Sequence, residues 1–160
     1  MREDAHVDLT EFLLARIAED EAVAQAASSG PWGFDPRDED LGEDGTVWCA
    51  ESHPDSIKNG MQYASTYVAQ TSYDGQSWSV HNSNADGEHI ARWDPARVLA
   101  ECEAKRRIVV DLHRPVTDGE GDWFCDMLET GAESNWPCET IRLLALPYAD
   151  HSDYREEWRP

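Results

Sequence analysis

The 160-residue chain lacks the motifs and long hydrophobic runs that identify many protein classes. No apolar run approaches 18 residues, so we expect no membrane-spanning helix. The first ten residues carry charges of both signs and no hydrophobic core, which is atypical of a secretory signal and favours a cytoplasmic protein. GxGxxG, P-loop, HExxH and GxSxG motifs are missing, so the common nucleotide, zinc-protease and serine-hydrolase sites are not indicated.

Lysine is almost absent, and positive charge is scarce altogether. Two lysines and 11 arginines oppose 33 acidic residues, which gives a net charge of −20. The excess is concentrated in residues 1–44, with net charge −10, and in residues 114–160, with net charge −7. Such a field repels nucleic acid and anionic membranes and favours basic protein partners, although it also serves solubility alone. The acidic residues that we expect to engage such a partner are Asp38, Glu39, Asp40, Glu43 and Asp44.

Four dipeptides that favour tight turns divide the middle of the chain. Each combines Asp or Asn with Gly, a pair that readily adopts the positive φ angles of hairpin turns. They are Asp44-Gly45, Asn59-Gly60, Asp74-Gly75 and Asp86-Gly87. The β-rich runs that follow them are Thr46 to Glu51, Met61 to Tyr73, Gln76 to Asn82 and Glu88 to Trp93. This pattern predicts a four-stranded antiparallel β-meander over residues 46–93.

Helices are expected before and after this meander. Asp8 and Glu11 form a capping pair ahead of apolar residues at helical spacing, which predicts a helix over 8–28 and an acidic loop over 31–45. Asp94-Pro95 predicts the start of a long helix over 94–113. A loop over 114–136, then a short helix at about 138–146 and a polar tail within 137–160, complete the chain. The predicted fold is therefore a single α+β domain.

The turns at Asp74-Gly75 and Asp86-Gly87 set a register that gives the predicted sheet two different faces. Trp78 and Trp93 would be buried on an aromatic face that the helices cover. The opposite, polar face would gather a candidate site for an anion or small ligand from Gln70, Ser79, His81 and Arg92. The alternative is an ordinary solvated sheet face.

The four cysteines are widely spaced and form no CxxC pair, so structural disulfides are not expected. The best candidate metal site combines His113, Cys125, Cys138 and His151, whose thiols and imidazoles suit tetrahedral zinc. Structural zinc sites usually include two ligands only two to four residues apart, whereas the gaps here are 11, 12 and 12 residues. We therefore expect no metal or other cofactor. In the alternative roles, Cys102 and Cys138 pack as small apolar groups, Cys125 lies in a loop and His113 is a charge at a helix C-terminus.

Two long segments carry a family resemblance. Residues 88–113 read EHIARWDPARVLAECEAKRRIVVDLH, and residues 137–160 read PCETIRLLALPYADHSDYREEWRP. Both resemble a family of short uncharacterised proteins from actinobacteria and their phages, a domain of unknown function. Members of that family often place Cys-x-x-Cys before the Pro-Cys pair. If that pattern carries zinc, the resemblance implies that His113, Cys125 and Cys138 match it, whereas Leu128 replaces the fourth ligand.

These observations favour a non-enzymatic, acidic binding or regulatory protein, in which no catalytic residues are identified. Its strongest form is a phage-derived mimic of nucleic acid, or an anti-defence protein, that engages a basic host protein. One alternative is a ligand-binding domain or enzyme that uses the polar sheet face or the His/Cys cluster. Another is a structural accessory protein. The sequence predicts no oligomeric state.

Overall fold

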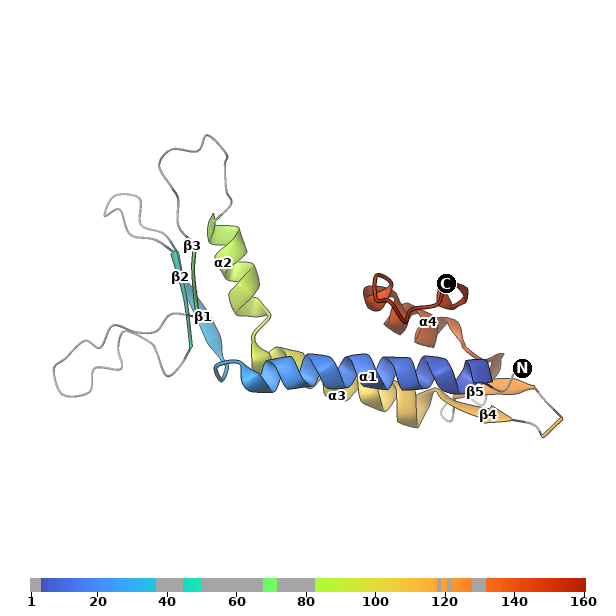
Figure 1. Cartoon of the computed structure of the whole chain (residues 1–160). Helices are drawn as coiled ribbons and strands as arrows, with labels where there is room; N and C mark the ends of the chain where they lie inside the picture. The colour runs from blue at the N-terminus through green and yellow to red at the C-terminus, as the bar shows by residue number, and fades with distance from the viewer. Residues whose placement is uncertain are drawn as a thin grey trace. The chain divides into compact units, whose positions relative to one another are not determined.

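The computed structural model describes residues 4–36, 45–49, 68–71, 83–117, 119–120, 122–127 and 132–160. These residues form helices and two small antiparallel sheets, so the α+β class is confirmed (Figure 1). The chain divides into two compact units, Val23–Leu99 and the combination of Met1–Ala22 with Ala100–Pro160. We call them the middle unit and the end unit. The assignment of one domain stays a prediction.

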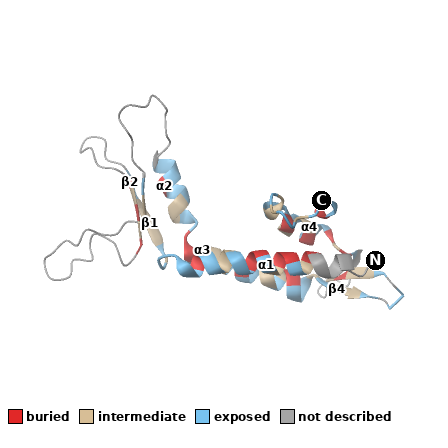
Figure 2. Ribbon diagram, in the orientation of Figure 1, coloured by how far each residue is buried: buried red, intermediate tan, exposed pale blue. Residues whose placement is uncertain are grey.

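Helix α1 spans Asp4–Ala26. It begins before the start of the predicted helix and ends two residues before the predicted end. Leu9, Phe12, Leu13 and Ile17 are buried, as expected for apolar side chains that recur every three or four residues. In the end unit these side chains belong to one face of the helix. The predicted stripe on this helix is therefore confirmed (Figure 2).

Helix α3, Pro95–Arg107, starts as the Asp-Pro pair predicted. Oδ1 of Asp94 accepts a hydrogen bond of 2.8 Å from the backbone N–H of Arg97, which caps the helix. The last turn of the predicted helix differs, because Ile108–Leu112 form a π-helix, η1. The backbone N–H of His113 bonds the carbonyl of Ile108, five residues earlier, at 2.9 Å. Leu112, in this π-helical turn, is 39 % exposed.

The sheet of the middle unit contains β1 (Trp32–Asp35), β2 (Gly45–Cys49) and β3 (Ala69–Thr71) in that order. The strand predicted after Asp44-Gly45 is confirmed over its described part. The loop predicted over 31–45 is wrong for β1, which pairs antiparallel with β2. Val47 and Cys49 on β2 are buried. Helix α2 (Ser83–Arg92) runs alongside this sheet (Figure 1).

The predicted strand Glu88–Trp93 is wrong, because this stretch lies mostly within α2. Asp86 lies in the first turn of the helix, where a carboxylate interacts favourably with the helix dipole. Gly87 is buried against the ring of Phe34 rather than placed at a hairpin turn. Trp93, predicted to be buried, is 42 % exposed. The turns at Asn59-Gly60 and Asp74-Gly75 and the strand Gln76–Asn82, including Trp78, lie outside the described residues.

The end unit contains a second sheet where the sequence predicted a loop over 114–136. Strands β4 (Arg114–Thr117), β5 (Trp123–Met127) and β6 (Ala132–Asn135) pair antiparallel in that order. Aromatic residues on β5 favour a strand, although Gly and acidic residues around it obscured the pattern. Gly119, between β4 and β5, has a φ of +81°, a conformation that suits glycine.

Helix α4 (Glu139–Ala145) and the 3₁₀ turns η2 (Leu146–Tyr148) and η3 (Glu156–Trp158) complete the end unit. The predicted short helix is confirmed, and Ile141 and Ala145 on it are buried. One apolar core joins α1, η1, β5 and the C-terminal segment (Figure 2). Its buried residues are Leu9, Phe12, Leu13, Val109, Cys125, Trp136, Cys138, Ile141, Ala145 and Trp158. This core surrounds the candidate site.

Candidate metal centre

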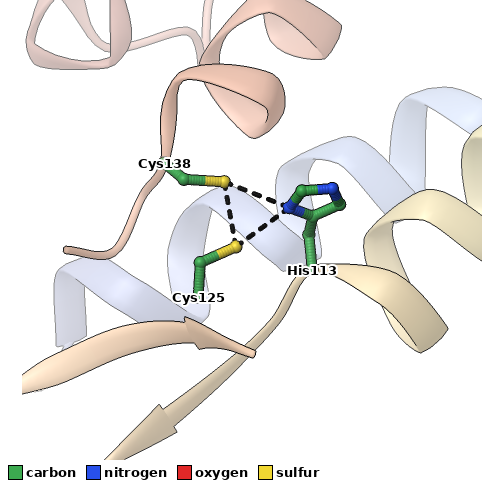
Figure 3. A group of neighbouring side chains, drawn as sticks. All are labelled: His113, Cys125 and Cys138. Atoms are coloured by element: carbon green, nitrogen blue, oxygen red, sulfur yellow. Dashed lines mark hydrogen bonds between the residues drawn. The ribbon is translucent and has the colours of Figure 1, made fainter. Parts of the chain in front are cut away.

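His113, Cys125 and Cys138 converge in the end unit, although 11 and 12 residues separate them in the sequence (Figure 3). Nδ1 of His113 lies 3.2 Å from Sγ of Cys125 and 3.3 Å from Sγ of Cys138. The two sulfur atoms are 2.9 Å apart. Three atoms that are each good metal ligands therefore form a small triangle.

Each member of the triangle is held by a different element. His113 directly follows η1, whose i→i+5 hydrogen bond ends at its own backbone N–H. Cys125 lies in the central strand β5, opposite Pro115 on β4 and Ser134 on β6. Cys138 is the extended residue immediately before α4. Because all three elements pack on the same core, the backbone sets the spacing of the ligand atoms.

The surroundings keep the Cys125 thiol protonated unless a metal ion replaces its proton. Cys125 is fully buried and Cys138 is 8 % exposed. Burial raises the pKa of the Cys125 thiol well above its usual value, and the hydrogen bond with Cys138 raises it further. A divalent cation would reverse this preference, since thiolates next to the ion are stabilised by its charge.

The triangle fits a tetrahedral ion with sulfur and nitrogen ligands. Ligands about 2.0–2.3 Å from such an ion lie about 3.3–3.8 Å from one another. The His113–Cys distances of 3.2 and 3.3 Å are close to this range, whereas the two sulfur atoms, 2.9 Å apart, must separate by about 0.9 Å to admit the ion. Two thiolates with one imidazole are a donor set typical of zinc.

His151, the fourth predicted ligand, lies elsewhere in the end unit. Its Nε2 contacts the guanidinium of Arg16, and its Nδ1 accepts a hydrogen bond of 3.1 Å from the backbone N–H of Asp153. Its ring packs edge-on against Phe12 at 5.7 Å. Among the residues that the structure describes, no fourth His, Cys, Asp or Glu joins the triangle. Leu128 lies outside them.

The other predicted site residues do not assemble into one described site. Gln70 is exposed on β3, whereas Arg92 is at the end of helix α2 rather than on a strand. Ser79 and His81 lie outside the described residues, as do the acidic residues Asp38, Glu39, Asp40, Glu43 and Asp44. The polar sheet face therefore stays a prediction for Ser79 and His81 and is wrong for Arg92.

Sequence reasoning missed one further group of side chains, at the junction of α2 and α3. His89, Trp93 and Arg97 recur every four residues and lie together around a hollow. A helical periodicity was present in this stretch, but the Asp86-Gly87 pair favoured a strand instead. Taking residues 83–97 as helical would have placed the three side chains on one face.

The fold and the triangle define a small α+β protein with a His-Cys-Cys cluster of zinc-ligand type. The chain belongs to the Family of unknown function (DUF6221), which matches residues 6–160. Membership of a family of unknown function, expected from the two sequence segments, is thus confirmed. No curated protein and no solved structure matches the chain. None of the helices in the described ranges is long and apolar enough to cross a bilayer.

Proposed function

We propose that this chain is a zinc-binding protein, with the ion held by His113, Cys125 and Cys138. The mutual approach of the three ligand atoms, within 2.9–3.3 Å, is the observation that carries the proposal. Buried cysteines elsewhere in the chain show no comparable grouping with His, Asp or Glu in the described ranges. The sequence lacks two ligands within a few residues of each other. This does not argue against a zinc site, because the fold brings the three ligand atoms together.

The ion serves structure in this proposal. It connects the end of η1, the central strand β5 and the start of α4, three elements that share the core of the end unit. Zinc at such a junction contributes its binding free energy directly to folding. The remaining coordination position belongs to water or to another ligand, which completes the four-coordinate geometry.

Metal analysis of the purified chain tests the proposal. We expect about one zinc per chain under reducing conditions, and removal with a chelator should lower the Tm by at least about 5 °C. Cys125→Ser and Cys138→Ser should each lose most of the zinc. Cys102→Ser is the matched control, since Cys102 is equally buried in the end unit but outside the triangle.

The same experiment overturns the proposal if the wild-type chain carries no zinc after folding in its presence. Retention of a full equivalent by both cysteine variants has the same consequence. Cobalt substitution provides a second measurement that does not depend on stability. A thiolate-to-cobalt charge-transfer band should appear in the wild type and in Cys102→Ser and be lost in the Cys125→Ser/Cys138→Ser double variant.

A second candidate function rests on charge. The end unit holds 21 acidic and nine basic residues, a net charge of −12, and it combines residues 1–22 with the acidic segment 114–160. The acidic residues 35–44 belong to the middle unit. Several arginines of the end unit already pair with its own carboxylates, such as Arg106 with Glu21 and Arg114 with Asp126. This supports an acidic surface that engages a basic host protein, in the manner of a nucleic-acid mimic of phage or actinobacterial origin.

Charge neutralisation tests this second candidate. One variant replaces the exposed carboxylates Glu139, Asp150, Asp153 and Glu157 by their amides, and another does so for Asp38, Glu39, Asp40, Glu43 and Asp44. We expect stoichiometric capture of one basic protein by the wild type, weakened by salt and by at least one variant. Equal capture by the wild type and both variants, at low and at high salt, would show that the negative charge serves solubility alone.

A further inference from the structure

A hollow of about 280 Å³ lies at the junction of α2 and α3 in the middle unit. Its walls come from one face of α2, from Trp93 in the turn and from the first part of α3. The lining residues are Ala85, Glu88, His89, Arg92, Trp93 and Arg97. All of them are described residues of one unit, so the hollow does not depend on how the two units are placed.

The hollow concentrates positive charge in an acidic environment. The middle unit has 12 acidic residues against only four Lys and Arg, a net charge of −8. Arg92 and Arg97 are two of those four cations, and His89 adds a third basic side chain. Within the described ranges, Arg92 makes no ion pair with a carboxylate, and the lining includes a single acidic residue, Glu88. A concave surface focuses the potential of the charges that line it.

Trp93 gives the same hollow an aromatic wall. Its side chain is 42 % exposed, the largest aromatic group left open to water among the described residues. The guanidinium carbon of Arg97 lies 4.0 Å from the centre of the Trp93 ring, and the His89 ring lies 6.2 Å away. This contact places the positive charge of Arg97 over the face of the indole ring, at the side of the hollow.

We propose that this hollow binds a small molecule that combines a planar ring with an anionic group. The anionic group, a carboxylate or a phosphate, is held by Arg92, and the ring packs against Trp93. The volume is at the lower limit of small-ligand pockets, which suits a ligand of one or two rings. Glu88 lines the same space, and its negative charge opposes the anionic group of the ligand.

The surrounding charge excludes longer anions. The net charge of −8 on this unit repels a polyanion such as nucleic acid, whereas a small anion interacts mainly with the arginines beside it. The site differs from the predicted polar sheet face, because Arg92 now acts with helical neighbours. It is also independent of the zinc proposal, since all three metal ligands belong to the end unit.

Titration of the full chain with four probes tests the proposal. Two probes combine a ring and an anion: 5′-adenosine monophosphate and indole-3-acetate. The other two, adenosine and inorganic phosphate, each lack one of these features. We expect at least one combined probe to bind with a Kd below about 1 mM and to shift the indole N–H resonance of Trp93, assigned with Trp93→Phe. Adenosine and phosphate should bind at least about tenfold more weakly.

Three variants assign the binding to this hollow. Arg92→Gln should lower the affinity for the combined probe at least about tenfold, because a charge-assisted hydrogen bond is lost. Glu88→Gln should tighten binding, an effect that loss of folding cannot produce. Arg107→Gln, whose side chain is 71 % exposed in the other unit, should leave affinity unchanged. The proposal is overturned if no combined probe binds or if phosphate alone binds as tightly as a combined probe. It is also overturned if Arg92→Gln binds a combined probe as tightly as the wild type does.

Discussion

Gly87 on α2 lies directly against the ring of Phe34 on β1. A Cβ atom at position 87 would come within 2.1 Å of Cε2 of Phe34, a distance that real side chains do not tolerate. The absence of a side chain at Gly87 therefore sets how closely the helix approaches the sheet. The same dipeptide, Asp86-Gly87, had indicated a hairpin turn in the sequence.

Gly87→Ala should lower the free energy of unfolding by about 1–3 kcal/mol, because the added methyl group overpacks the helix–sheet interface. Alanine favours helix over glycine by about 1 kcal/mol, so a stabilising effect would contradict the close approach. Denaturant unfolding measures the difference, with the exposed Glu88→Ala on the same helix as control. Phe34→Val should lower the free energy of unfolding less in the Gly87→Ala background than in the wild type. The reason is that removing the ring relieves the overpacking that the added methyl group causes.

His151→Ala should retain about one zinc per chain, in contrast to His113→Ala, if the proposed centre is correct. The variant should nevertheless be destabilised by about 1–3 kcal/mol, because the buried Arg16 loses a partner and Phe12 loses a ring contact. Metal analysis and thermal unfolding of the same samples separate the two effects. Loss of zinc from a folded His151→Ala chain would restore His151 as a ligand.

Tyr148 and Tyr154 form a natural pair of tests for a buried hydroxyl. The Tyr148 hydroxyl donates a hydrogen bond of 2.7 Å to Asp20, whereas the buried Tyr154 hydroxyl has no hydrogen-bond partner among the described residues. Tyr148→Phe should cost about 1–2 kcal/mol of stability, because Asp20 loses a donor. Tyr154→Phe should be neutral or slightly stabilising. Equal losses from both variants would contradict the prediction, because both variants keep the ring and only the Tyr148 hydroxyl donates to Asp20.

Glu21 and Arg106 link α1 and α3 through two hydrogen bonds of 2.7 and 2.8 Å. The bond from Arg106 holds the pKa of the Glu21 carboxyl below its ordinary value of 4.5. A lowered pKa in the folded state means that the pair stabilises the fold above pH 4.5 and that this contribution is lost as pH falls through the folded-state pKa.

Glu21→Gln should therefore be less stable than the wild type at pH 7, and the gap should narrow steadily below pH 4.5. Urea unfolding across this range measures the gap at each pH. Arg106→Gln should reproduce the profile, because it removes the same hydrogen bonds. A gap that stays constant with pH would show that the two variants act through packing alone.

Helices α1, α3 and α4 were predictable from sequence because their signals are local, whereas α2 was mistaken for a strand. Asp94 caps α3 through its own side chain, and the apolar spacing from Leu9 to Ile17 reports one buried face regardless of what covers it. The strands were harder, since β4, β5 and β6 are short and depend on partners across a sheet. Gly87 shows the same difficulty, because only the neighbouring Phe34 ring distinguishes close packing from a turn.

The residues of the candidate metal centre could be predicted from the sequence, but their convergence in space could not. Residue type alone suggested His113, Cys125 and Cys138, since thiols and imidazoles are zinc ligands. Their convergence depends on the sheet β4–β6, which the sequence did not indicate. His151 was grouped with them by residue type, but its surroundings near Phe12 and Arg16 are set by the packing of the C-terminal segment.

The π-helical turn η1 makes the position of His113 depend on chain length as well as on residue identity. In a π-helix one more residue is accommodated per turn than in an α-helix, as the bond between His113 and Ile108 shows. Deleting one residue, such as the exposed Val110, would let α-helical pairing continue and rotate everything after it by about 100° around the axis. The imidazole would then swing away from both sulfur atoms with every ligand still encoded. Relatives that keep the three ligands are thus constrained to conserve the number of residues in this turn. An insertion or deletion there would indicate loss of the metal site as clearly as the loss of a cysteine.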